Sequence, residues 1–134
     1  MDLARLLLPA IPTYERALTV RGLRQELIGR NLANAATPGY RAVELPFEAA
    51  MERLSAQEAP PPLAATDRRH LQPEAAAAPD LPLVETGEPG PDGNSVDLEA
   101  EAGRMAANSL LYDATAQITA AYMNHLLRAI REGR

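Results

Sequence analysis

The 134-residue chain contains no cysteine, no tryptophan and no lysine, and its only aromatic residues are four tyrosines and one phenylalanine. The lack of cysteine excludes a disulfide framework and a thiolate zinc site. Because aromatic side chains are few and much of the apolar content is alanine, we do not expect a large compact core. Long helices with alanine-rich contact faces are favoured, within a single domain.

An excess of positive charge and a long apolar run are also missing. The chain has 13 basic and 18 acidic residues, so its formal net charge is −5, and we expect no nucleic-acid partner. Leu6, Leu7 and Leu8 are followed by Pro9, and this run is too short for a secretory signal or a membrane span. Taken alone, these features predict a soluble cytoplasmic protein.

Residues that could form a catalytic or metal-binding group are equally scarce. His70 and His125 are isolated in the sequence, and Asp92, Asn94 and Asp97 lack the other ligands of a calcium loop. No glycine-rich phosphate loop follows a predicted strand. We therefore predict no enzyme activity, no catalytic residue, no metal and no cofactor.

The most informative stretch that is present reads NLANAATPGYRA and spans residues 31–42. Thr37, Pro38, Gly39 and Tyr40 fit a type II turn, in which proline presets φ at the second position and glycine accepts a positive φ at the third. Proline also disfavours helical geometry in the residue before it, so the preceding helix should end by about residue 36. An extended segment should follow the turn.

The chain reads as helix, irregular middle, helix, which predicts a mainly α fold. We expect the first helix from Tyr14 to Ala35, with Thr13 as its N-cap. We expect the second, capped by Ser95 or Asp97, to run to about Arg131 and to be about 50 Å long. The predicted regions are 1–40, 41–91 and 92–134.

The middle region carries few signals of order. Eight of the twelve prolines fall between residues 55 and 91, a composition typical of loop, extended or disordered chain. Val43, Leu45 and Phe47 alternate as in a strand, but Phe47 to Leu54 could also form a short helix. Pro46 separates these two interpretations.

The C-terminal helix has a heptad seam that is too wide for one partner helix. The seam comprises Leu98, Ala102, Met105, Ser109, Tyr112, Ala116, Thr119, Met123, Leu126 and Ile130. We therefore expect burial between subunits. The predicted contact residues are Leu18, Ile28 and Leu32 on the first helix and Met105, Tyr112, Met123, Leu126 and Ile130 on the second. An intramolecular hairpin or a plain coiled-coil dimer is the alternative.

An ordinary helix end does not explain why asparagines stand at both 31 and 34. With them, the stretch resembles the pattern N-[LI]-A-N-x-x-T-P-x-Y-[KR]-A of the bacterial flagellar basal-body rod family. Residues 66–70 resemble a T-x-x-x-H element in the middle of proximal rod members. Residues 92–99, DGNSVDLE, resemble the start of their C-terminal helix, and residues 108–112 resemble the segment that follows.

The resemblance implies a structural subunit that polymerises helically in the proximal rod and transmits torque. Its implied partners are copies of itself, other rod proteins, the ring–rod junction protein and the export gate. The implied location is the basal body on the periplasmic side of the inner membrane, near the membrane without spanning it, after type III export without a cleaved signal peptide. The motif residues would fix the exit of the chain from the inner helical layer; they are Asn31, Asn34, Thr37, Pro38, Gly39 and Tyr40.

Other functions remain open from the residues alone. A cytoplasmic coiled-coil adaptor or secretion chaperone would account for the heptads and the acidity, but not for the turn motif. A small enzyme would need a catalytic group that the sequence does not offer. Contact of the segment Leu3–Leu8 with a membrane is a weaker idea, because Arg5 interrupts it.

Overall fold

The computed structural model describes residues 10–56 and 80–132. The elements follow in the order α2 (Ile11–Ala33), β1 (Ala42–Glu44), α3 (Phe47–Ala56), β2 (Val84–Thr86) and α4 (Leu98–Glu132). Helices dominate, which confirms the predicted mainly α fold. Within the described residues, none of the helices has the length and apolar character needed to cross a membrane.

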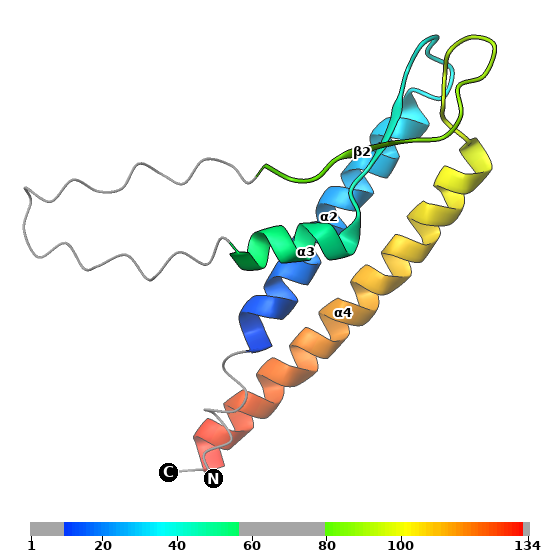
Figure 1. Ribbon diagram of the computed structural model, residues 1–134. Coiled ribbons are helices and arrows are strands. Elements are labelled where there is room, and N and C mark those ends of the chain that lie inside the picture. The colour runs from blue at the N-terminus through cyan, green and yellow to red at the C-terminus, as the bar shows by residue number, and fades with distance from the viewer. Residues whose placement is uncertain (1–9, 57–79, 133–134) are drawn as a thin grey trace, which may run out of the picture.

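Helices α2 and α4 lie side by side and antiparallel, so the chain forms a long hairpin (Figure 1). The turn after α2, the two strands and the loop before α4 gather at the closed end. This is the intramolecular hairpin that the sequence left open as an alternative. The packing of α2 on α4 accounts for part of their apolar surface, and burial between subunits stays a prediction. Because α4 has 35 residues and α2 has 23, α2 still cannot cover α4 along its whole length.

The two short strands form an antiparallel ribbon that crosses α2 (Figure 1). Ala42 pairs with Thr86, and Glu44 pairs with Val84. Strand β2 lies in the segment predicted to be irregular, and a proline-rich sequence gave little sign of it. Around Pro46 both sequence interpretations hold in part, because β1 ends before this proline and α3 begins after it.

The apolar core lies between α2, α3 and the ribbon rather than between the two long helices. Val20, Leu45 and Ala50 are buried at its centre. The half-buried residues around them are Leu23, Leu27, Phe47, Met51, Leu54 and Leu81. The guanidinium of Arg21 lies over the Phe47 ring, 4.4 Å from its centroid. Burial lowers the pKa of Arg21, with a further decrease from the charge of Arg24 and an opposing effect of Glu48.

The observed helix ends correct some of the predicted ones. Helix α2 begins at Ile11 and ends at Ala33, and Thr13 does not cap it; Ala10 holds the N-cap position without a side-chain hydrogen bond. Pro12 suits the first turn, where a missing N–H costs nothing. At α4, Asp97 is the cap, because its Oδ1 accepts a hydrogen bond from the Ala100 N–H at 3.0 Å.

Three predicted features fall outside the described residues. They are the apolar segment within residues 1–9, the T-x-x-x-H element at 66–70 and the alanine tract at 75–78.

Candidate functional site at the closed end of the hairpin

The amide of Asn31 connects three parts of the closed end. Its Nδ2 donates to the Val43 carbonyl at 2.9 Å and to the Glu101 carboxylate at 3.2 Å. Its Oδ1 accepts hydrogen bonds from the Tyr40 hydroxyl at 3.1 Å and from the Val43 N–H at 3.2 Å. The side chain is only 1% exposed, so each of these bonds forms away from water. One side chain thus ties α2 to the turn, to β1 and to α4.

The predicted turn after α2 is present. The Tyr40 N–H donates to the Thr37 carbonyl at 3.2 Å, and Gly39 has a φ of 73°, as a type II turn requires at that position. Asn34 supports the turn on its inner side, since its Oδ1 accepts a hydrogen bond from the Thr37 hydroxyl at 3.3 Å. The motif residues therefore do redirect the chain out of the helix.

Asn94 binds the end of α2 from the other half of the chain. Its Nδ2 lies within hydrogen-bonding distance of the carbonyls of Asn34, Ala35 and Thr37, at 2.9–3.0 Å. Carbonyls at a helix C-terminus lack partners within the helix, so this amide supplies the missing donor. The Asn94 Oδ1 accepts from the Val96 N–H at 2.7 Å, which fixes the amide orientation. The two sequence motifs, 50 residues apart, thus form one unit.

Further hydrogen bonds join the same segments. The Gly39 N–H donates to the Asp92 carbonyl at 3.0 Å, and the Ser95 N–H donates to the Tyr40 carbonyl at 3.0 Å. The Ser95 hydroxyl accepts from the Ala42 N–H and donates to the Thr86 carbonyl, both at 2.9 Å. We call this unit the asparagine junction, and its side chains come from Asn31, Asn34, Tyr40, Asn94, Ser95 and Glu101.

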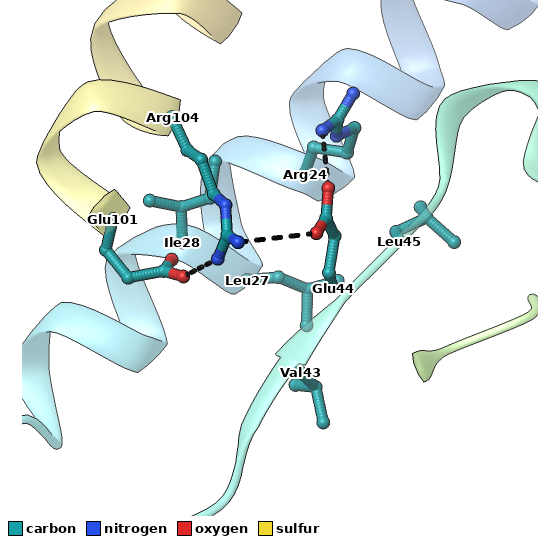
Figure 2. A pocket seen from close by; sticks show the side chains of 8 residues that line it. All are labelled: Arg24, Leu27, Ile28, Val43, Glu44, Leu45, Glu101 and Arg104. Carbon is teal, nitrogen blue, oxygen red and sulfur yellow. Dashed lines mark hydrogen bonds and ion pairs between the residues drawn. The ribbon is translucent and has the colours of Figure 1, made fainter. Parts of the chain in front are cut away.

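A cluster of charges lies beside the junction (Figure 2). Glu44 pairs with Arg24 at 2.9 Å and, more loosely, with Arg104 at 4.0 Å. Arg104 also pairs with Glu101, the carboxylate that Asn31 contacts. Glu101 is 1% exposed, and a buried carboxylate needs such partners because unpaired burial is costly. The pairs hold the first turns of α4 against α2 and β1.

The closed end contains little open space. The cavity beside the charge cluster measures about 10 Å³, room for a single water at most and not for a substrate. Among residues 10–56 and 80–132, no group of three histidine, aspartate or glutamate side chains could hold a metal ion. Nearly every polar atom of the junction already bonds within the chain.

The predicted contact residues divide into covered and exposed sets. Ile28 and Leu126 are buried within the chain, and Leu18, Leu32 and Met105 are half-buried. Tyr112, Met123 and Ile130 are exposed. Their role as subunit contacts stays a prediction.

The inward stripe of α4 differs from the predicted seam. Glu101 and Asn108 are buried on it, although the seam assigned Ala102 and Ser109 to those turns. An apolar heptad pattern does not predict that a glutamate and an asparagine are buried, so the predicted seam lies one residue away from Glu101 and Asn108. The junction residues that sequence reasoning missed are Asn94, Ser95 and Glu101. Asn94 did stand in the DGN motif, where its spacing indicated only a turn.

Several of the exposed apolar residues of α4 lie on the two sides of this stripe, at 100° per residue. Leu111 and Ile118, seven residues apart, lie on one side. Tyr112, Met123 and Ile130 lie on the other. The helix therefore presents two different apolar flanks to its surroundings.

Comparison with known proteins agrees with the two motifs. No family model matches the chain. The chain is 31% identical to the flagellar basal body rod protein FlgB of Yersinia enterocolitica over 130 residues, covering 92% of this chain and 95% of that protein. It is 34% identical to FlgB of Aeromonas hydrophila over 127 residues, covering 91% and 92%. With FlgB of Salmonella typhimurium the identity is 28% over 130 residues, covering 92% and 94%.

A helical hairpin closed by a polar junction, with relatives of this kind along nearly its whole length, defines a structural protein of the flagellar basal-body rod. Within that class, the chain belongs to the FlgB family. The family resemblance and the basal-body location expected from the motifs are thereby confirmed. The relatives support a structural role in the rod over the cytoplasmic adaptor or secretion chaperone that the residues alone left open.

Proposed function

We infer that the chain is a proximal rod subunit that polymerises helically, joins the membrane ring and export gate to the distal rod and hook, and transmits torque. The observation that carries this inference is the pair of unlike apolar flanks on α4. An open helical polymer needs contacts between non-identical patches, and two different flanks on one helix meet that need.

The exposed contact residues belong to this polymer contact. Tyr112, Met123 and Ile130 are 41–58% exposed, and a row of large apolar side chains in water is characteristic of an interaction surface. Neighbouring subunits cover them with their own α2 and α4 surfaces, including the half-buried Leu18 and Leu32. Ile28 and Leu126 support the same surface from beneath, because they are already buried.

The asparagine junction gives the polymer its stiffness. Its hydrogen bonds and charge pairs hold the ribbon and both helix ends in one arrangement, so the closed end moves as a rigid body. Torque requires such a body, because a loose hinge between subunits would absorb rotation. The ring–rod junction protein, the export gate and the next rod protein are the proposed partners, reached by type III export without a cleaved signal peptide.

The direct test is electron microscopy of basal bodies from a deletion strain, combined with a swimming assay. We expect non-motile cells whose basal bodies stop at the membrane ring, without rod or hook. Return of the unmodified gene should restore rods and swimming. Motile deletion cells with complete hooks would contradict the proposal.

A further inference from the structure

A groove of about 460 Å³ lies between α2 and α4, away from the asparagine junction and its charge cluster. Its lining comprises Gly22, Gln25, Glu26, Asn108, Ser109, Tyr112 and Asp113. We call it the α2–α4 groove. No part of the proposed function explains its chemistry.

One buried polar atom beside the groove has no partner. Asn108 is 3% exposed, and its Nδ2 donates to the Arg21 carbonyl at 2.9 Å and to the Gln25 Oε1 at 2.8 Å. These two bonds fix which atom is the oxygen. The Asn108 Oδ1 is buried and accepts no hydrogen bond from the described residues. A buried acceptor without a donor is unfavourable, so a donor that enters the groove would relieve that cost.

Gly22 is a second feature that the chain alone does not explain. It lies in the interior of α2, where glycine is less stable than alanine. A Cβ built on Gly22 would meet no atom within 4 Å, so packing among the described residues does not require a glycine. The missing side chain keeps the groove open.

The groove is suited to a cation. Glu26 and Asp113 line it, and neither forms an ion pair with the described part of the chain. None of its lining residues is basic. Tyr112 is 41% exposed and can offer a ring face to a positive group. An occupant must therefore be positively charged and rich in hydrogen-bond donors, and a guanidinium meets both requirements with five N–H groups in one plane.

We propose that the α2–α4 groove binds an arginine from the C-terminal end of α4 of a second copy of this chain. Without lysine, arginine is the only side chain of this protein that is always positive. Arg128 is exposed near the end of α4, and it has no ion pair within the described residues. The negative charge of Glu26 and Asp113 in the groove is complementary to the positive charge of Arg128.

The contact joins the tail of one copy to the middle of the next. Such a heterologous contact does not close on itself and can continue along a helical assembly. The inference rests on the proposed polymerisation, for which it names one contact. Side-chain rotamers commonly change when partners dock, so the exposed Tyr112 can turn to let the arginine approach Asn108.

Disulfide cross-linking in assembled rods tests the contact, because the chain has no cysteine of its own. Two forms of the full chain, Asp113→Cys and Arg128→Cys, are expressed together in the deletion strain. Isolated basal bodies are then treated with a thiol oxidant. We expect a dimer band from the mixed chains and none from either form alone. Positions 113 and 128 of one chain lie about 22 Å apart along α4, too far for an intramolecular disulfide.

The control replaces Asp113→Cys by Ala114→Cys, since Ala114 is exposed on the same helix but does not line the groove. Loss of the band in this control is expected. Rods that assemble and support swimming, yet give no 113–128 band or an equal band with Ala114→Cys, would overturn the groove contact and leave the rod function intact. Such a result would also follow if a different rod protein filled the groove.

If the cysteine variants do not build rods under reducing conditions, charge reversal decides the question. Asp113→Arg should abolish swimming while the helix content of the purified chain stays unchanged. Adding Arg128→Asp in the same chain should restore swimming, because the pair is then reversed. Failure of the double variant to recover any swimming would overturn the proposal.

Discussion

The two ends of the hairpin are built on different chemistry. At the closed end, buried polar side chains such as Asn31, Asn94 and Glu101 find partners within the chain. Towards the open end, α4 exposes Met123, Leu127 and Ile130, and the tilted ring pair of Tyr14 and Tyr122, with centroids 5.7 Å apart, is a contact between the two helices. Most buried polar groups of the closed end are thus paired within one chain, whereas α4 leaves several large apolar side chains exposed towards the open end.

The largest effect should come from removing the central amide of the closed end. Asn31→Ala would leave the Val43 N–H and carbonyl without partners and weaken the support of the buried Glu101, so we expect a loss of about 4 kcal/mol in the free energy of unfolding. Urea denaturation followed by circular dichroism measures it. The matched change at the open end, Asn124→Ala, should alter stability by less than about 0.5 kcal/mol because Asn124 is exposed. Equal losses from both variants would remove the distinction between the two ends.

A pair of glycine substitutions compares the packed loop before α4 with the exposed face of α4. Gly87 has a φ of 80°, and a Cβ there would lie 2.1 Å from the Ser95 carbonyl oxygen, so Gly87→Ala should destabilise the chain by about 3 kcal/mol. Gly103 lies within α4, and a Cβ there meets nothing within 4 Å. Gly103→Ala should therefore stabilise by about 0.5–1 kcal/mol. Thermal unfolding of both variants gives the signs, and a stabilised Gly87→Ala would show that the loop does not pack on Ser95.

Local chemistry made part of the closed end predictable from the sequence. Pro38 and Gly39 define the turn by their φ preferences alone, and Asp97 caps α4 because its carboxylate follows a loop and precedes a helix. The pairing of β1 with β2 was not predictable, because it joins segments about 40 residues apart and β2 carries no strong strand signal.

The inward direction of α4 was the harder part to predict. Glu101 and Asn108 face α2, where Asn31 and Gln25 provide partners, while Arg104 of the next turn of α4 pairs with Glu101. Burial of a polar group depends on those partners, and a hydrophobic pattern contains no information about them. The pattern did identify the excess apolar surface of α4, because that surface depends on composition and helical spacing alone.

A smaller loss is expected when the cap of α4 is removed. Asp97→Ala takes away the acceptor for the Ala100 N–H and a negative charge at the helix N-terminus, which should cost about 1 kcal/mol. Asp113→Ala is the matched control. Asp113 is exposed and lies near the middle of α4, so its replacement should not measurably change the free energy of unfolding. Chemical denaturation of the two variants compares them. A similar loss at both positions would mean that charge in general, rather than the cap, stabilises α4.

The smallest effect on stability should accompany the largest effect on assembly. Ile130 is 58% exposed, so Ile130→Gln removes little buried surface and should change the free energy of unfolding by less than about 0.5 kcal/mol. In the proposed rod, however, a neighbour covers this side chain, and a polar group would enter that contact without a partner. We therefore expect purified Ile130→Gln to unfold like the unmodified chain while cells that carry it build fewer rods and swim poorly. Gln117→Ala, an exposed change on the same helix, should leave both properties intact. If Ile130→Gln instead destabilised the purified chain while cells carrying it swam normally, Ile130 would be packed within its own chain and would not belong to a contact between subunits.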